Sequence, residues 1–117
     1  MDHKKVLGLA GLAAKAGKAA SGEFSTEKSV KSGKGFLVLL AEDASANTRK
    51  KFENMCAFYE VPIYDTVDKE TLGRAVGKQM RACLSVEDEN LAAAIQKALM
   101  ENSRAVSERK DTDHVKQ

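Results

Sequence analysis

The chain contains few of the residues that support disulfide scaffolds, metal centres or common catalytic sites. Its 117 residues include no tryptophan, one proline, two cysteines and two histidines, and aromatic residues make up 5% of the total. Cys56 and Cys83 lie far apart in the sequence, and His3 and His114 lie near its two ends. A zinc site needs about four ligands, and a catalytic triad needs a placed histidine. The sequence therefore predicts no metal, no cofactor and no enzymatic activity.

The two cysteines also bear on the compartment. They form no Cys-x-x-Cys pair and have no histidine nearby. We interpret Cys56 and Cys83 as reduced, buried side chains of a cytoplasmic protein, because disulfides are rare in that compartment. A thiol switch is the alternative interpretation.

Long apolar runs are absent as well. No run reaches the roughly 18 apolar residues that a membrane-spanning helix requires, so we expect no membrane partner. The apolar segment 6–14 could begin a signal peptide, but Lys15 and Lys18 follow it closely. We therefore interpret this segment as an amphipathic first helix, with secretion as the alternative.

What is present fits one globular domain. Hydrophobic residues make up 43% and charged residues 31%, which is typical of a soluble fold. A chain of this size buries roughly two thirds of its unfolded surface. No internal repeat or linker is visible. We expect a domain over residues 1–101 and a polar tail over residues 102–117 that frays, and we expect a monomer.

Charge is distributed unevenly along the chain. The net charge is only +2, but residues 1–34 contain seven lysines against three acidic residues. Residues 72–81 contain three basic residues and no acid, whereas the segments 35–71 and 82–101 each have an acidic excess. The two basic segments form one basic face if the fold brings them together. The alternative is that these charges are solvated surface positions.

The pattern of apolar residues predicts helices that alternate with short strands. The apolar run 36–41 predicts a central strand covered on both sides, and Pro62 in the short strand 61–64 indicates a position near a strand start or at a sheet edge. Phe52, Met55, Cys56 and Tyr59 are predicted on one buried stripe of the helix that ends near residue 59. Asp68 is expected to cap a helix. The predicted helices are 4–16, 24–32, 47–59, 69–76 and one beginning near residue 91, and the other strands are 19–20 and 82–86. We predict an α/β fold, a three-layer α/β/α sandwich around a small mixed sheet of about four strands.

Two short polar motifs follow strands. Gly22 leads into a helix start with Ser25, Thr26 and Lys28 in its first turns, and free N–H groups at a helix start suit phosphate. Ser25 or Thr26 is placed to reach a base edge, and the alternative is that one of them caps its own helix. Glu42 and Asp43 are expected to complement a helix N-terminus rather than to act in catalysis.

The order of these pieces resembles a known family. The segment from Leu9 to Lys18 precedes Ser21-Gly22, the Leu-Ala-Glu-Asp-Ala block at 40–44 and the Leu-Gly-x-Ala-x-Gly block at 72–77. Together, over about residues 4–100, they resemble the kink-turn RNA-binding ribosomal-protein superfamily of the archaeal "seven-Ae" and eukaryotic "thirty-e" type, and its bacterial YlxQ-like branch. The resemblance implies an α/β/α sandwich and a non-catalytic, ribosome-associated RNA-binding protein whose partner is a kink-turn, ribosomal RNA or another bent RNA.

The resemblance also implies which residues contact the RNA. The family uses the helix start that matches Gly22–Lys28, together with a loop before the last strand that closes over an unstacked nucleotide. Lysines along the first basic segment are expected on phosphates. The implied RNA-binding residues are Lys18, Gly22, Glu23, Phe24, Ser25, Thr26, Lys28, Lys31, Lys34, Ser45, Lys69, Lys78, Gln79, Met80, Arg81 and Ala82.

The chain departs from the family's pattern at the helix start. Well-studied members have a polar pair that reads guanine edges, and this chain has Phe24-Ser25. An aromatic side chain is able to stack on a base instead. The main alternative function is a protein-interaction module of the same fold that docks through its last helix, and a detached methyltransferase accessory domain ranks last.

Overall fold

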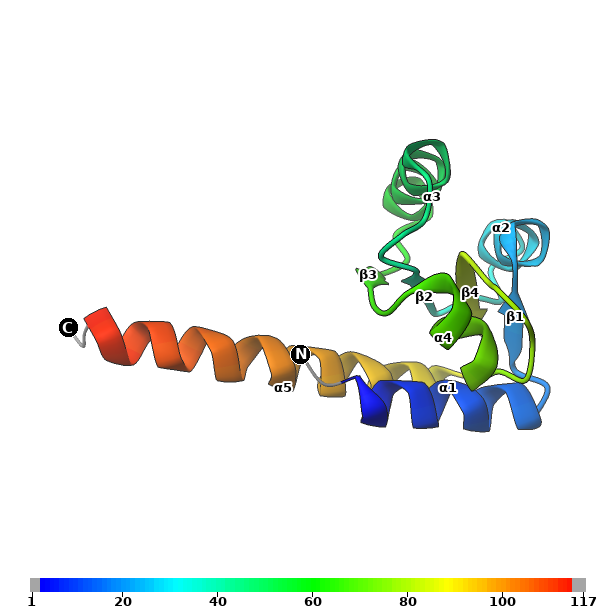
Figure 1. The fold of residues 1–117 in the computed structure, drawn as a ribbon. Helices are drawn as coiled ribbons and strands as arrows, with labels where there is room; N and C mark the ends of the chain where they lie inside the picture. Colours follow the sequence, from blue (N-terminus) through cyan, green and yellow to red (C-terminus); the bar gives the residue numbers. More distant parts are fainter. Residues whose placement is uncertain (1–2, 115–117) are drawn as a thin grey trace.

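The computed structural model describes the backbone of residues 3–114 and the side chains of residues 3–101. Within these residues the chain forms five helices and a four-stranded mixed sheet (Figure 1). The elements are α1 (Lys4–Lys15), β1 (Ala19–Ser21), α2 (Glu23–Lys31), β2 (Leu37–Leu40), α3 (Ala46–Tyr59), β3 (Ile63–Asp65), α4 (Lys69–Ala75), β4 (Cys83–Val86) and α5 (Glu89–His114). The predicted α/β/α sandwich is confirmed.

The sheet has the strand order β1-β4-β2-β3. Strand β2 pairs in parallel with β3 and antiparallel with β4, and β4 also pairs antiparallel with β1. Consequently β1, β2 and β3 finish at the same end of the sheet at which β4 starts. We call this end of the sheet the site end, and the opposite end, where β1, β2 and β3 begin, the far end.

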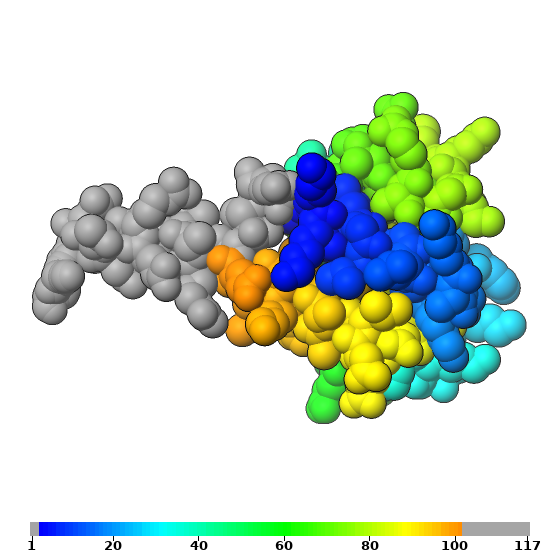
Figure 2. All heavy atoms as spheres, turned by 90° about the horizontal axis from the view of Figure 1, so that it is seen from below, coloured from blue at the N-terminus to red at the C-terminus, as the bar shows by residue number. Residues whose placement is uncertain are grey.

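The two faces of the sheet carry separate cores because side chains alternate along each strand. Leu37 and Leu39 of β2 face a cluster made with α1, α4 and α5, whereas Val38 and Leu40 face α2 and α3. The helices lie in two layers accordingly, with α2 and α3 above the sheet in Figure 1 and α1 and α5 below it. Seen from below, α1 and α5 lie side by side (Figure 2).

The helix boundaries follow local chemistry. Gly17 after α1 has a φ of 72°, a backbone conformation that glycine adopts without strain. Ser45 Oγ caps α3 by accepting from the Thr48 N–H at 3.1 Å, and Asp68 caps α4 by accepting from the Thr71 N–H at 3.2 Å. The hydrogen bond from the Thr71 hydroxyl is the main cause that lowers the pKa of Asp68. The predicted cap at Asp68 is confirmed.

Most predicted elements are confirmed within one or two residues, and one detail is wrong. Tyr59 was predicted on the buried stripe of α3, but 40% of it is exposed. It is the last residue of the helix, and Glu60 ends α3 in a left-handed conformation with φ 59°. Tyr59 therefore lies past the part of α3 that Phe52, Met55 and Cys56 bury against the sheet.

The last helix continues beyond its amphipathic part. Ala92, Ile95 and Leu99 are buried, as predicted, and α5 extends to His114. Side chains from residue 102 onward lie outside the described residues, so the predicted fraying of this tail stays a prediction. None of the helices within the described residues is long and apolar enough to cross a membrane.

Candidate nucleic-acid interface

Four chain segments meet at the site end because four strand termini meet there. They are the β1–α2 junction, the loop after β2, the loop after β3 and the loop that enters β4. Most of the residues singled out from the sequence lie on these segments. The sequence order had separated them by up to sixty positions, and the mixed sheet brings them together.

The start of α2 is open to solvent. Gly22 has a φ of 93°, and its N–H donates to the Cys83 carbonyl at 2.9 Å, which fixes the turn against β4. No side chain caps the helix, so the first-turn N–H groups have no side-chain acceptor. Ser25 therefore does not cap α2, contrary to the alternative weighed from the sequence. Free N–H groups at a helix start favour a negatively charged or hydrogen-bond-accepting ligand.

The side chains of this first turn divide into exposed and buried positions. Phe24 is 81% exposed, and Ser25 and Lys28 are also exposed. Thr26 is fully buried, and its hydroxyl donates to the Ala20 carbonyl at 3.3 Å. Thr26 therefore supports the turn from inside, and its side chain is not on the surface that a ligand reaches.

An open hollow of about 550 Å³ lies beside the α2 start. Arg81 crosses its floor: the guanidinium Nε donates to Ser21 Oγ at 3.1 Å, and its side chain passes over Gly22. A side chain at Gly22 would contact Arg81 at 3.8 Å. The hollow is lined by Ser21, Gly22, Glu23, Phe24, Ser25, Lys69, Met80, Arg81 and Ala82. It joins the two basic segments of the sequence at one surface.

The loop that enters β4 is held by the glycines of the Leu-Gly-x-Ala-x-Gly block. At Gly73 a Cβ atom would lie 1.4 Å from the Gln79 carbonyl oxygen, so only glycine allows this approach. The Lys78 N–H donates to the Gly73 carbonyl at 2.8 Å, and Gly77 turns the chain with φ 74°. Met80 is thereby placed at the rim of the hollow with 57% of its side chain exposed.

The sequence of this chain also matches a known protein family. The model of the Ribosomal protein L7Ae/L30e/S12e/Gadd45 family matches residues 4–112. The chain belongs to this family.

Two curated relatives agree with that assignment. RNA-binding protein YlxQ of Bacillus subtilis (strain 168) is 42% identical over 84 residues, which cover 72% of this chain and 84% of the relative. RNA-binding protein YlxQ of Enterococcus faecium is 35% identical over 77 residues, covering 66% and 75%. Both names describe RNA binding, in line with the prediction of an RNA-binding protein.

The solved structures share the fold. A protein with unknown function from Bacillus halodurans C superimposes with a TM-score of 0.76 at 35% identity, covering 80% of this chain and 94% of that one. The Giardia lamblia 15.5kD RNA binding protein superimposes with a TM-score of 0.69 at 24% identity, covering 78% and 81%. At that identity the second likeness concerns the fold alone.

In this L7Ae-family chain, backbone hydrogen bonds tie Lys69 to the hollow. The Lys69 N–H donates to Asp43 Oδ1 at 2.9 Å, and the Lys69 carbonyl accepts from the Arg81 N–H at 3.0 Å. Asp43 thus complements a helix N-terminus, as predicted, but the helix is α4 and not the adjacent α3. Lys69 connects the loop after β2 with the loop that enters β4.

Ser45 is connected to the start of α2 through hydrogen bonds with its neighbours. Its hydroxyl donates to Thr48 Oγ1 at 3.0 Å, and the Thr48 hydroxyl donates to Glu23 Oε2 at 3.0 Å. Ser45 is itself exposed at the start of α3. This chain of hydrogen bonds links the starts of α2 and α3 at the site end.

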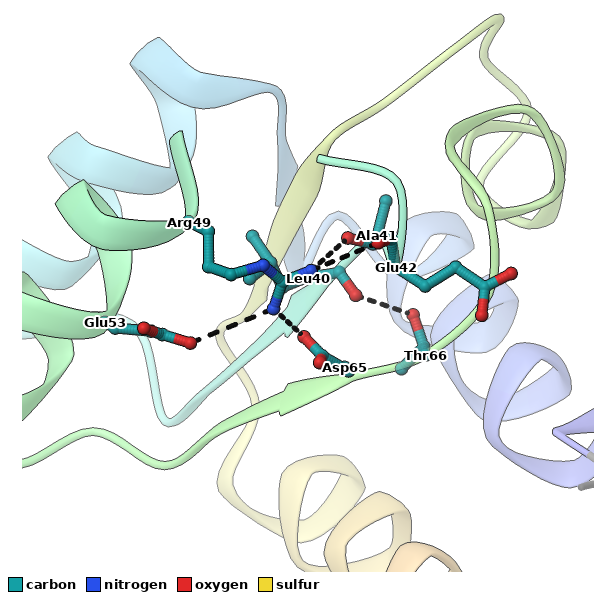
Figure 3. A network of polar contacts seen from close by, with 7 residues as sticks. All are labelled: Leu40, Ala41, Glu42, Arg49, Glu53, Asp65 and Thr66. Atoms are coloured by element: carbon teal, nitrogen blue, oxygen red, sulfur yellow. Dashed lines mark hydrogen bonds and ion pairs between the residues drawn. The ribbon is translucent and has the colours of Figure 1, made fainter. Parts of the chain in front are cut away.

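A network around Arg49 was missed by the sequence analysis (Figure 3). Its guanidinium donates to Asp65 at 2.5 Å and to the carbonyls of Ala41 and Glu42 at 3.3 and 3.2 Å. The hydrogen bond with Asp65 raises the pKa of Arg49. The network fixes the loop that carries Asp43 and Ser45. Its only sequence signal was an arginine one turn into a helix that follows a strand.

The lysines of the first basic segment do not gather at one point. Lys28 is exposed and makes no ion pair among the described residues, whereas Lys31 pairs with Glu27 at 2.7 Å. Lys18 and Lys34 lie at the far end, beside the residues that precede β1 and β2. Of the residues in the two basic segments, Lys28 and Arg81 therefore lie at the site end, whereas Lys18 and Lys34 do not.

Lys78 and Gln79 face a neighbouring hollow. This second depression of about 450 Å³ is lined by Glu70, Arg74, Lys78, Gln79 and Met80. Arg74 is partly neutralised by its ion pair with Glu70 at 3.1 Å. Met80 is common to both depressions, so it stands as a ridge between them.

The alternatives from the sequence analysis find little support. Burial raises the pKa of Cys56 and of Cys83 to about 11, which leaves both thiols protonated and disfavours a thiol switch. Between Leu91 and Met100 most apolar side chains of α5 are buried, so a docking face on this stretch is reduced to Met100 and small residues. Within residues 3–101, no cluster of three or more His, Cys, Asp or Glu side chains is placed to hold a metal ion.

Proposed function

We propose that this protein binds kink-turn RNA or a similarly bent structured RNA, without chemistry, in association with the ribosome in the cytoplasm. The observation that carries the proposal is the hollow between the open start of α2 and the loop that enters β4, flanked by Lys28, Lys69 and Arg81. Family membership and the names of both curated relatives support RNA as the ligand.

The start of α2 enters the groove at the bend in this proposal. The free N–H groups of its first turn and the Ser25 hydroxyl meet base edges or phosphate oxygens. Phe24 projects into solvent beside them and stacks on an exposed base where relatives use polar side chains. Lys28, one turn further along the same face, contacts a phosphate.

The loop that enters β4 covers an unstacked nucleotide. Met80 offers an apolar contact, and Arg81, held over Gly22 by Ser21, offers a planar cation to a base face. Lys69 also lines this hollow, beside Arg81, and Ser45 lies on the adjacent loop. Lys18, Lys31, Lys34, Lys78 and Gln79 contact parts of the RNA farther from the bend.

Binding to two matched RNAs tests this proposal. A gel-shift titration compares a standard kink-turn RNA with the same duplex whose sheared G·A pairs are replaced by Watson–Crick pairs, at two salt concentrations. We expect tight, salt-sensitive binding to the kinked RNA and much weaker binding to the straight one. Equal binding to both would replace kink-turn recognition with a general basic RNA surface.

Absence of binding to either RNA would favour the protein-interaction module instead. A pull-down that is insensitive to nuclease would then identify that partner. Sedimentation of ribosomes from a lysate tests the ribosome association separately. We expect the protein in the ribosomal fraction, and its loss from that fraction after nuclease treatment.

A further inference from the structure

The aromatic side chains of this chain are distributed unusually. Only six residues are Phe or Tyr, and four of them are exposed: Phe24 by 81%, Phe36 by 41%, Phe58 by 79% and Tyr59 by 40%. Large aromatic side chains are normally among the most buried. In a chain with so few of them, four exposed rings indicate a surface with a binding role.

All four exposed rings lie on the α2–α3 side of the sheet. Phe24 is on α2, and Phe58 and Tyr59 end α3. Alternation along the chain places Phe36 on the side of Val38 and Leu40, which face α2 and α3. The layer formed by α1, α4 and α5 carries none of them.

Three of these rings lie on segments at the far end, where α3 ends and β2 begins. The Val38 N–H donates to the Pro62 carbonyl at 2.9 Å, which brings the segment after α3 beside the start of β2. The rings of Phe58 and Tyr59 pack edge to face with centroids 4.9 Å apart. We call Phe36, Phe58 and Tyr59, together with Lys31 and Lys34, the aromatic end.

Lysines accompany these rings. Lys31 pairs with Glu27 at 2.7 Å, and this hydrogen bond is the main cause that raises the pKa of Lys31. Glu27 also pairs with Lys51 at 2.9 Å, so one acid is shared by two lysines. Lys34 follows α2 at the same end. Glu60 is the acidic residue next to Tyr59.

A hollow connects the aromatic end to the RNA interface. It has a volume of about 460 Å³ and is lined by Phe24, Glu27, Lys28, Lys31 and Ser32, along the outer face of α2. From Phe24 to Lys31 the helix rises roughly 10 Å. A strand that leaves the hollow at the site end therefore has a continuous path to the aromatic end.

We propose that the aromatic end binds an unpaired RNA segment that continues from the bent RNA along α2, with bases stacked on Phe58 and Tyr59. This inference rests on the proposed function. Stacking on aromatic rings beside cations is the usual way in which proteins hold unpaired nucleotides. Lysine is depleted at protein–protein interfaces, so Lys31 and Lys34 beside the rings favour RNA over a protein partner.

The test compares a blunt kink-turn RNA with the same RNA carrying an unpaired extension of about eight uridines at one strand end, tried on each end in turn. The unmodified protein should bind one extended RNA at least about fivefold more tightly than the blunt RNA. Phe58→Leu combined with Tyr59→Leu should abolish this gain and leave the affinity for the blunt RNA unchanged.

Two variants control for indirect effects. Phe58→Tyr keeps an aromatic ring and should keep the gain, and Leu12→Ala changes an exposed residue of α1 on the opposite layer and should also keep it. A 4-thiouridine in the extension should crosslink to residues 58–59.

Three outcomes would count against one or both ideas. Equal binding of extended and blunt RNA by the unmodified protein would overturn this proposal. A gain that survives in the double variant would also overturn it. Failure to bind the blunt RNA at all would refute the proposed function first.

Discussion

On one face of the sheet, α1, α4 and α5 bury an aliphatic cluster in which Leu37, Leu84 and Ile95 are fully enclosed. On the other face, α2 and α3 bury a smaller cluster that includes both cysteines, and beside it four hydroxyl side chains are buried. Ser29 and Ser85 Oγ atoms, for example, share a hydrogen bond at 2.8 Å across this face.

The two faces also differ on the outside. The α2–α3 layer exposes aromatic rings and begins at the open hollow, whereas the α1–α4–α5 layer exposes few large apolar side chains, Leu12 and Met100 among them. From this contrast we expect stability to depend mainly on the α1–α4–α5 layer and RNA recognition mainly on the α2–α3 layer. Four substitutions, given in order of decreasing expected effect, test that division.

Ile95→Ala should lower the free energy of unfolding most. Ile95 is fully buried in the aliphatic cluster, and truncations of this kind cost about 2–5 kcal/mol. Urea denaturation measures the loss, and the folded protein should keep its RNA affinity. Met100→Ala, one turn further on the exposed side, should stay within about 0.5 kcal/mol. A similar loss in both variants would contradict the division.

Gly73→Ala should weaken RNA binding by moving the loop that enters β4. The new methyl group would lie at 1.4 Å from the Gln79 carbonyl oxygen, so the loop must shift at a cost of about 1–3 kcal/mol. We expect RNA affinity to fall at least about fivefold, the equivalent of one lost stacking contact. Gly8→Ala meets nothing within 4 Å, and it should leave affinity unchanged.

Lys28→Ala should weaken binding and flatten its salt dependence. One lost phosphate contact lowers the slope of log affinity against log salt by about one. The titration is repeated at several salt concentrations, with Lys97→Ala on α5 as the control for a change of the same charge. If the slope and affinity of Lys28→Ala match those of the unmodified protein, Lys28 is not at the interface.

Glu27→Gln should have the smallest effect, a loss of stability that is present near neutral pH and disappears in acid. Hydrogen bonds from Lys31, and then from Lys51, lower the pKa of Glu27 from 4.5 to about 2. A carboxyl with a lowered pKa in the folded state stabilises the fold above pH 4.5, and this contribution is lost as the pH falls towards 2. Melting temperatures between about pH 5 and pH 2.5 should therefore fall less steeply in Glu27→Gln. An identical pH profile would show that the two ion pairs add nothing to stability.

Much of this fold was accessible from the sequence because periodicity reports burial. The run 36–41 was predicted as a central strand, and all four residues of β2 are buried between β4 and β3. The edge position inferred from Pro62 is confirmed by β3. Tyr59 was misplaced because periodicity describes the face of a helix but not where the helix leaves the sheet.

The candidate site was accessible only in part. The sequence pointed to Gly22, Phe24 and Arg81, but it could not show that Thr26 turns inward to the Ala20 carbonyl. Lys18 and Lys34 were counted with Lys28 because they are close in sequence. However, Lys18 precedes β1 and Lys34 follows α2, so both lie at the far end of the sheet. The Arg49 network depends on loops from two parallel strands, which no local pattern describes.

The position of β4 within the sheet has a consequence for biosynthesis. It lies between β1 and β2, yet it is the last strand along the chain, and Ala19 pairs with Val86. Until β4 leaves the ribosome, β1 has no partner and β2 pairs only with β3. Such nonlocal pairing slows folding, and it postpones completion of the sheet to the end of translation. The hollow requires both β1 and β4, so a nascent chain stopped before residue 83 has no RNA interface to offer.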